Sequence, residues 1–263
     1  MTSSLSVGFL GLGEAGSAIA ADLVALEVDV CGWDPRPVAA PPGVRLVDQP
    51  RDLAGAEVIL SVNSATVAEE AAASVAPFLR SSTLFADLNS GGAALKRAVS
   101  DVIAATDSLF ADVALMATVP GNGVRTPSFA SGPGANRFAA VFAPLGMPVE
   151  VIGDQPGAAA TRKLLRSVLM KGLAVTAVEA LRAADAAGCR AWMWNEIATT
   201  LTGADEALLT RLVEGTTRHA ARRGHEMEDA SALLRELQVT PHICQAAAQA
   251  LHELASSASV AGV

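Results

Sequence analysis

Two of the three lysines in the 263-residue chain, Lys163 and Lys171, lie in one short segment with Ser167 between them. A spacing of four residues places these three side chains on one face of a helix. Neighbouring cations and burial favour the neutral form of a lysine, and a lysine that changes its charge readily can donate or accept a proton. We therefore predict catalytic roles for Lys163, Ser167 and Lys171. The alternative is a solvated cationic helix face.

Other cationic residues in the C-terminal half could hold an anionic group. Arg166 lies beside the lysine face. A second basic segment, RHAARRGHEM at residues 218–227, places His219, Arg222 or Arg223, and Glu226 along one face of a helix. We predict that Arg166, His219 and Arg222 bind substrate, although ion pairs on a helix surface would give the second segment the same pattern.

The N-terminal segment VGFLGLGEAG, residues 7–16, runs from apolar residues into Gly11, Gly13 and Gly16, which are spaced G-x-G-x-x-G. In a dinucleotide-binding turn, the first glycine permits the tight turn, the second lets the backbone approach a pyrophosphate, and the third lets helix and strand pack closely. The N-terminus of the following helix offers unpaired N–H groups and the positive end of a dipole. Alone, the motif is equally compatible with a simple strand-to-helix turn.

The surroundings of the glycines favour the dinucleotide interpretation. Residues 6–10 have the pattern of a buried strand, residues 15–26 that of an amphipathic helix, and residues 28–33 that of a second strand, which ends at Asp34. An acidic residue at about this distance from the glycines, roughly 20 positions, accepts hydrogen bonds from the adenosine ribose. The residues that we predict to contact the dinucleotide are Gly11, Leu12, Gly13, Glu14, Ala15, Gly16, Asp34, Arg36, Asn63, Ser64 and Asn89.

Strands and helices then continue to alternate. Residues 57–62, 84–87 and 110–116 read as further strands, which predicts an α/β fold with a Rossmann-type, doubly wound and mostly parallel sheet. Ligands of such sheets bind at the carboxyl ends of the strands. The polar residues that follow two of these strands are Asn63, Ser64, Asn89 and Ser90, for which helix capping is an equal alternative to ligand contact.

The pattern changes after Asp154, which we predict to cap a helix of about 32 residues that stops before Gly188. We place a domain boundary there, giving a Rossmann domain at residues 1–155 and an all-α domain for substrate binding and dimerisation at residues 156–263. The turns expected within the second domain are near Gly203, Gly224 and Thr240–Pro241.

Composition narrows the classes of partner. The formal net charge of -8 disfavours nucleic acid and anionic membranes. The three cysteines (Cys31, Cys189 and Cys244) are too far apart to suggest a disulfide framework or a zinc site, so no metal is expected. The sequence shows no signal peptide and no apolar stretch long enough to span a membrane. We therefore expect a cytoplasmic protein.

Missing residue types exclude several classes of nicotinamide enzyme. The chain has no tyrosine, whereas short-chain dehydrogenases rely on a Tyr-x-x-x-Lys pair. All four histidines lie within the last 45 residues, which disfavours the lactate and malate dehydrogenase arrangement. The absence of a cysteine and histidine cluster disfavours zinc-dependent alcohol dehydrogenases. A nicotinamide enzyme with a lysine acid/base group remains.

The segments VGFLGLGEAG, DLNS and FADVALM, followed by a long helix with a lysine, resemble the β-hydroxyacid dehydrogenase superfamily over essentially the whole chain. This superfamily includes 3-hydroxyisobutyrate and 6-phosphogluconate dehydrogenases. The segments RKLLRSVLMKGLAVTAVEAL and RHAARRGHEMED look more like a 6-phosphogluconate-dehydrogenase-like branch with its own helical C-terminal domain. The resemblance implies hydride transfer between NAD or NADP and a small, anionic hydroxy acid or its carbonyl counterpart, in a homodimer.

The family's helix motif K-x-x-N-N corresponds here to Lys163-Leu-Leu-Arg166-Ser167, so the resemblance implies that Lys163 is the general acid/base. As a mechanism, we expect the nicotinamide to lie near Asn89 and Ser90 and the substrate to lie between it and the long helix, so we include both residues among the catalytic residues. The family's substrate loop, D-x-P-V-S-G-G, reads DVALMAT at residues 112–118, without the serine and glycines that cradle a carboxylate. The loop residues expected to bind substrate are Met116, Ala117 and Thr118.

The cofactor preference depends on two neighbouring residues. Asp34 repels a 2′-phosphate and favours NAD, whereas Arg36 lies where an arginine could accept that phosphate. We expect NAD and keep NADP open. Two other functions share this architecture: an imine reductase, whose active site usually lacks the catalytic lysine, and a nicotinamide-binding protein without turnover.

Overall fold

The computed structural model describes residues 5–260 of the chain. The chain divides into two compact units, of which the first ends at Arg166 and the second begins at Ser167. These units are defined by spatial compactness alone. They do not test the domain boundary near residue 155, which stays a prediction.

The first unit is built on an eight-stranded sheet with the order β3-β2-β1-β4-β5-β6-β7-β8. All neighbouring strands are parallel except β6 and β7. The predicted Rossmann-type sheet is confirmed, with the strand order reversing between β1 and β4. The strands are β1 (Ser6–Leu10), β2 (Asp29–Trp33), β3 (Arg45–Leu46), β4 (Val58–Ser61), β5 (Leu84–Asp87), β6 (Leu109–Leu115), β7 (Ser128–Ser131) and β8 (Val149–Gly153).

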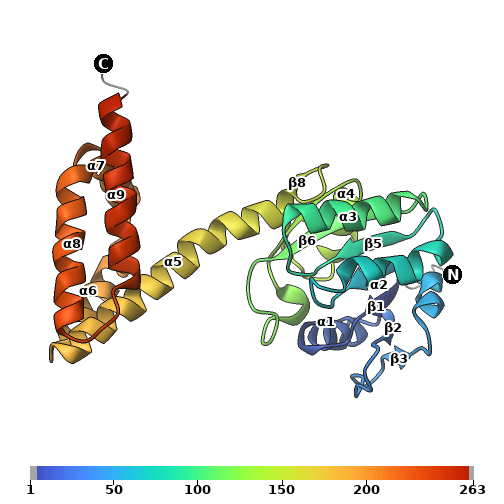
Figure 1. Cartoon of the computed structure of the whole chain (residues 1–263). Helices are drawn as coiled ribbons and strands as arrows, with labels where there is room; N and C mark the ends of the chain where they lie inside the picture. The colour runs from blue at the N-terminus through green and yellow to red at the C-terminus, as the bar shows by residue number, and fades with distance from the viewer. Residues whose placement is uncertain (1–4, 261–263) are drawn as a thin grey trace. The chain divides into compact units, whose positions relative to one another are not determined.

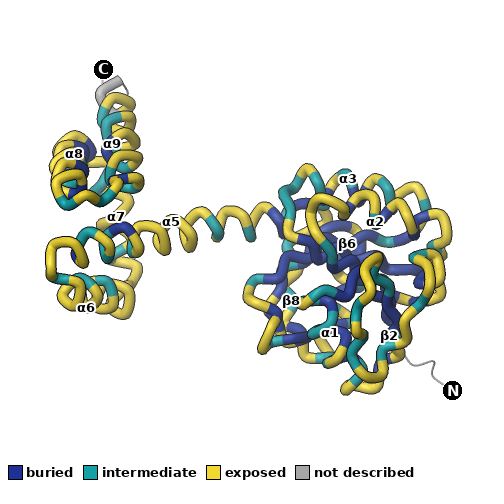
Figure 2. The backbone as a smooth tube through the Cα atoms, turned by 60° about the horizontal axis from the view of Figure 1, so that its bottom comes forward, coloured by how far each residue is buried: buried dark blue, intermediate teal, exposed yellow. Residues whose placement is uncertain are grey.

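Helices cover both faces of this sheet, and its central strands form a buried layer (Figure 2), whereas the edge strands β3 and β8 are largely exposed. On one face, Ile19 of α1 and Phe138 of α4 pack into the same apolar cluster as Phe9 of β1. On the other, Val99 of α3 packs with Phe85 of β5, and α2 and α3 lie side by side (Figure 1). The helices of this unit are α1 (Glu14–Ala25), α2 (Ala68–Val75), α3 (Ala93–Ala104) and α4 (Ala135–Phe142), with short 3-10 turns η1 (Pro50–Gly55), η2 (Ala76–Phe78) and η3 (Gly123–Arg125).

The strand register aligns a row of residues that lies at the carboxyl ends of β1, β4 and β5 and in the middle of β6. Leu10 pairs with Ser61, Ser61 with Asp87, and Asp87 with Asp112. Register partners in neighbouring strands project to the same face of a sheet. Ser61, Asp87 and Asp112 are all fully buried, so this row places hydroxyl and carboxylate groups inside the protein. Buried polar groups of this kind need partners.

Helix α5 (Ala158–Ala186) starts later than the sequence suggests and is capped differently. The prediction that Asp154 caps it is wrong. Instead the Asp112 carboxylate Oδ2 accepts from the amides of Gly157 and Ala160, each at 3.1 Å, and the Ser131 hydroxyl accepts from the Ala159 amide at 3.0 Å. The acceptors lie on the sheet, which anchors the helix to β6 and β7.

The second unit is entirely helical, as predicted. It continues α5 and adds α6 (Arg190–Thr202), α7 (Glu206–Arg218), α8 (Ala220–Glu236) and α9 (His242–Val260). The expected turn near Gly224 is wrong, because Gly224 lies inside α8. A Cβ there would come within 2.7 Å of the His252 ring on α9, so the glycine allows α8 and α9 to pack closely. The turn falls instead at His219, between α7 and α8.

Glu179 of α5 caps the N-terminus of α9. Its carboxylate accepts from the amides of Ile243, at 2.9 and 3.1 Å, and Cys244, at 2.9 Å. Burial raises the pKa of Glu179, but these hydrogen bonds outweigh it and hold the pKa below its usual range. The contact fixes α9 to α5 within the second unit.

Within residues 5–260, every helix is too short or too polar to span a membrane. Nor does any group of histidine, cysteine and acidic side chains in that part of the chain have the arrangement of a metal site. Cys31, Cys189 and Cys244 are all free thiols.

Candidate functional site

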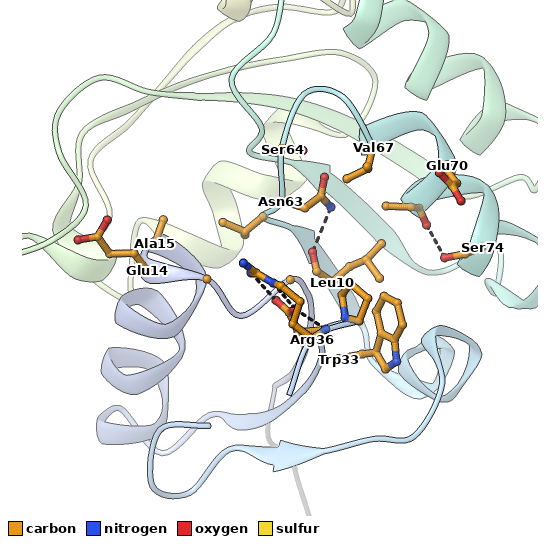
Figure 3. A pocket seen from close by; sticks show the side chains of 16 residues that line it. Leu10, Glu14, Ala15, Trp33, Arg36, Asn63, Ser64, Val67, Glu70 and Ser74 are labelled. Atoms are coloured by element: carbon orange, nitrogen blue, oxygen red, sulfur yellow. Dashed lines mark hydrogen bonds and ion pairs between the residues drawn. The ribbon is translucent and has the colours of Figure 1, made fainter. Parts of the chain in front are cut away.

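A cleft of about 550 Å³ opens where the strand order reverses, between the carboxyl ends of β1 and β4 (Figure 3). The glycine turn, the segment from Trp33 to Arg36, and Asn63 line it, together with the start of α2. Open parallel sheets bind ligands at such a reversal point. The cleft therefore lies where the sequence predicts a nucleotide.

The three glycines of the turn have different constraints. Gly11 has φ +111°, and a Cβ there would lie 2.3 Å from the Val62 carbonyl oxygen. A Cβ on Gly16 would lie 2.4 Å from the Gly11 carbonyl oxygen. A Cβ on Gly13 would have no atom nearer than 3.9 Å, the Arg36 Nη2. Gly11 and Gly16 thus shape the turn, whereas Gly13 leaves open space in front of it.

The open space faces the start of α1. Gly13 occupies the N-cap position and has no side chain to satisfy the first amides of the helix. Glu14 and Ala15, the first residues of α1, also line the cleft. Free amides at a helix N-terminus bind anionic oxygens. The turn therefore fits a pyrophosphate, and a dinucleotide would be held here.

Asp34 and Arg36 form a hydrogen-bonded pair at the edge of the cleft. Asp34 Oδ2 accepts from the Leu12 amide at 3.0 Å, and Oδ1 accepts from the Arg36 amide at 3.0 Å and from its Nε at 3.1 Å. Burial raises the pKa of Asp34, but the Arg36 side chain and the two amides outweigh it and keep the pKa below its usual range. The Arg36 side chain is 72% exposed and reaches into the cleft beside the glycine turn (Figure 3). The surroundings of Asp34 therefore favour its charged form, with an exposed cation next to it.

Apolar side chains line part of one end of the cleft, where Glu70 and Ser74 also lie (Figure 3). The Trp33 indole borders it, and Val67 and Ala71 line the same cavity (Figure 3). An aromatic ring and small aliphatic groups suit a planar heterocycle, because both offer flat apolar contact. This end fits the base of a nucleotide.

Asn63 and Asn89 have separate roles in the structure. Asn63 Nδ2 donates to the Leu10 carbonyl at 3.3 Å and to Ser61 Oγ at 3.0 Å, while its buried Oδ1 has no partner among the described residues. Asn89 lies behind it, 4% exposed, and its Oδ1 accepts from the Asn63 amide. Asn63 can accept a hydrogen bond from a ligand, whereas Asn89 supports Asn63. Ser64 is exposed and hydrogen-bonds to Thr66 at 2.7 Å.

Lys163 and Ser90, far apart in sequence, meet at the same carboxyl edge of the sheet. The Lys163 ammonium donates to Ser90 Oγ at 3.3 Å. Ser90 is exposed and follows β5, whereas Lys163 is half-buried on α5, one turn beyond the amides that Asp112 caps. The structure thus brings together two of the residues for which the sequence predicts catalytic roles.

Arg166 contacts the loop that follows β6. Its Nη1 donates to the Met116 carbonyl at 3.1 Å, and the Met116 amide donates to the Pro127 carbonyl at 2.7 Å. Ala117 and Thr118 are exposed. Arg166 therefore fastens the predicted substrate loop, and binding of substrate by its guanidinium stays a prediction.

Four predicted site residues belong to the second unit. Ser167 and Lys171 continue α5, and Lys171 is exposed. His219 is exposed at the end of α7, and Arg222 pairs with Glu226 within α8. That pair is the i, i+4 arrangement that the sequence left open as an alternative. The roles of these residues in catalysis and substrate binding stay predictions.

Sequence reasoning missed a buried ion cluster beneath the edge of the sheet. The Lys96 ammonium lies 3.0 Å from Asp87 Oδ2 and 3.3 Å from Asp112 Oδ1, and all three side chains are at most 1% exposed. Burial raises the pKa of Asp87 above its ordinary value, although Lys96 acts in the opposite direction. The available signal was an acidic residue within each of two buried strands, Asp87 in β5 and Asp112 in β6. Two such carboxylates side by side require a cation.

A family described as a domain of unknown function, DUF1932, matches residues 184–254. A conserved hypothetical protein from Sinorhizobium meliloti 1021 is 30% identical, with a TM-score of 0.66 over 95% of this chain and 88% of that chain. A conserved protein of unknown function, whose structure is described as similar to 3-hydroxyacid dehydrogenases, is 26% identical, with a TM-score of 0.63 over 95% of this chain and 96% of that one.

The chain is also similar to an imine reductase from Myxococcus stipitatus that was solved in complex with NADP+. The TM-score is 0.80 at 22% identity, over 97% of this chain and 94% of that chain. At this identity the similarity shows a shared fold.

The two glycines Gly16 and Gly13 should respond differently to a methyl group. Gly16→Ala forces α1 away from the Gly11 carbonyl and should lower the free energy of unfolding by about 2 kcal/mol. Gly13→Ala has room for its Cβ and should change it by less than about 1 kcal/mol. Urea denaturation followed by circular dichroism measures both. Equal destabilisation by the two variants would contradict this description of the turn.

Proposed function

The chain belongs to the β-hydroxyacid dehydrogenase-like superfamily, and on this basis we propose that it is an NAD(P)-dependent oxidoreductase. We infer that it moves a hydride between the nicotinamide and a small, anionic hydroxy acid or its carbonyl counterpart. The observation that carries this proposal is the contact of Lys163 with Ser90 in the same compact unit as the glycine-lined cleft.

The residues of the cleft fit a nicotinamide dinucleotide. The free amides at the start of α1 would bind the pyrophosphate, and the orphaned Asn63 Oδ1 offers an acceptor to a hydroxyl or amide group. The ionised Asp34 suits the ribose hydroxyls of NAD. Arg36, which is exposed beside it, suits the additional phosphate of NADP. When bound, the cofactor supplies or accepts the hydride.

Lys163 would supply the proton that accompanies the hydride. In the reductive direction its ammonium donates a proton to the substrate oxygen, and in the oxidative direction its neutral amine removes that proton from the hydroxyl. Ser90, 3.3 Å from the ammonium, would orient the same oxygen through its hydroxyl. Arg166 would act mainly by holding the loop at Met116 in place.

Reduction of an imine is the second candidate. The loop DVALMAT lacks the serine and glycines that cradle a carboxylate in hydroxy acid dehydrogenases, and Met116 gives it an apolar residue instead. An uncharged imine suits such a loop better than a carboxylate does. Lys163 favours the hydroxy acid. A panel of keto acids and cyclic imines separates the two, and turnover of either excludes a protein that only binds nicotinamide.

The contact between Asp34 and Arg36 should decide the cofactor preference. We expect micromolar binding of NADH by isothermal titration calorimetry, and weaker binding of NADPH. Asp34→Asn should weaken NADH about tenfold, because a charge-assisted hydrogen bond to the ribose is lost. Arg36→Ala should weaken NADPH and leave NADH nearly unchanged. Tighter binding of NADPH by the natural chain would reverse the assigned preference, and no binding of either would refute the proposed cofactor.

Removal of Lys163 should affect turnover and spare cofactor binding. We expect Lys163→Ala to lower kcat by about 100- to 10,000-fold, the usual contribution of a general acid or base. Its Kd for the cofactor should stay within about twofold, since the glycine cleft does not include Lys163. Lys171→Ala is the matched control on the same helix and should mainly raise KM. Turnover retained by Lys163→Ala would refute the assignment.

We propose in addition that the protein is a homodimer. In the second unit, Val168 is 75% exposed, Leu169 67%, Trp194 60% and Val213 60%, and long parts of α5 and α6 are exposed (Figure 2). Apolar surface of this extent marks an interface. A second copy is the occupant that the family resemblance implies.

Light scattering after size-exclusion chromatography should give the mass of two chains. Replacement of Val168 and Leu169 by aspartate should give the mass of one chain, because the charges cannot be buried in an apolar interface. Phe78→Asp alters an exposed apolar residue of the first unit and should leave the mass unchanged. A monomeric natural chain would contradict the proposal.

A further inference from the structure

The buried cluster of Lys96, Asp87 and Asp112 is not explained by nucleotide binding or by proton transfer. Lys96 reaches it from α3, and its ammonium donates to the Asp87 carbonyl at 2.8 Å. The same ammonium forms ion pairs with Asp87 Oδ2 at 3.0 Å and with Asp112 Oδ1 at 3.3 Å. One ammonium therefore bridges the end of β5 and the middle of β6.

One arm of the cluster leads to the cleft and to Ser90. Asp87 Oδ1 accepts from the Asn89 amide at 3.2 Å and from its Nδ2 at 2.5 Å. Asn89 in turn accepts from the amide of Asn63, whose side chain lines the cleft. Ser90 is the next residue after Asn89. The backbone that presents Ser90 is therefore held from below by Asp87.

The other arm leads to Lys163. Asp112 Oδ2 accepts from the amides of Gly157 and Ala160 and from Ser131 Oγ, each at 3.1 Å. Lys163 lies one helical turn after Ala160. The first turns of α5, and with them the position of Lys163, are thus fixed by the oxygen of Asp112 that faces away from Lys96.

We propose that Lys96 is a positioning residue that sets the separation between Ser90 and Lys163, by joining the carboxyl end of β5 to the first turns of α5. The role of this separation in turnover rests on the function proposed above. Lys96 itself lies too deep to touch a substrate, since its side chain is 1% exposed.

The charges of the cluster argue for a geometric role. Two carboxylates share one ammonium in a buried site, and an apolar group of similar volume is often as stabilising as a buried ion pair. The ammonium differs from an apolar group because it attracts the carboxylates of two strands at once, Asp87 on β5 and Asp112 on β6, and Asp112 in turn holds the start of α5. Such contacts hold catalytic groups within a narrow range of positions.

Two variants break the connection between the end of β5 and the start of α5 without increasing the net charge of the buried cluster. Lys96→Met combined with Asp87→Asn removes one positive and one negative charge, and leaves Asp112 with its donors on α5 and β7. Asp112→Asn leaves Lys96 paired with Asp87. Because asparagine has one side-chain oxygen, it cannot pair with Lys96 and accept from the α5 amides at the same time. Glu179→Gln is the matched control, because Glu179 is also a buried carboxylate that caps a helix, but in the second unit.

The first readout is independent of any reaction. The chain has three lysines, so limited acylation with an acetylating reagent, followed by peptide mass spectrometry, measures Lys163 and Lys171 separately. Loss of the connection should expose Lys163 and raise its acylation rate by about threefold or more, while Lys171 stays nearly constant. The second readout is kcat with the active substrate, which should fall by about tenfold or more with cofactor Kd little changed. Glu179→Gln should change neither.

Unchanged Lys163 acylation and unchanged kcat in folded variants, as judged by circular dichroism and Tm, would overturn the proposal. If the double variant does not fold, Asp112→Asn decides the question by the same two readouts. If the natural chain shows no turnover and Lys163 acylation still rises in the variants, the proposed oxidoreductase function fails while the positioning role of Lys96 stands.

Discussion

The ammonium of Lys96 lies between the carboxylates of Asp87 and Asp112, and the carboxyl edge of the sheet is built around that contact. Parallel strands bring their carboxyl ends to one edge, but their backbone ladder does not fix the segment after each strand. Here the side chains do so: Asp87 holds the segment with Asn89, and Asp112 holds the start of α5. The chemistry available at this edge depends on both attachments.

In the proposed function, the cleft binds the cofactor, and the carboxyl edge of the sheet provides the groups for proton transfer. The glycine turn leaves space and free amides in front of α1, and Gly11 and Gly16 pack too tightly for any side chain. Lys163 and Ser90 add a proton-bearing pair that the turn lacks. A superfamily that keeps the turn and varies the edge can change substrates without changing its cofactor, which is why the fold alone leaves the substrate to experiment.

Local patterns predicted the parts of the structure that depend on local physics. The glycine turn, the buried strands and the long helix each follow from periodicity and from residues with special backbone preferences. The sequence did not reveal the partners that come from distant strands. Asp154 is a reasonable cap by position, but Asp112 on β6 holds α5 instead. In the sequence, Lys96 has the pattern of a solvated helix residue, but in the structure it pairs with Asp87 and Asp112. Gly224 suggests a turn, but in the structure it lies within a helix and leaves room for the His252 ring.

The most direct test of the central claim is transfer of deuterium from a nicotinamide cofactor labelled at its hydride position. The protein is mixed with labelled NADH or NADPH and a panel of keto acids and cyclic imines, and the products are examined by mass spectrometry. We expect one class of product to carry the deuterium, and the Lys163→Ala variant to form almost none. Tight binding of the cofactor without deuterium in any product would contradict the claim that this cleft and this lysine form an oxidoreductase site.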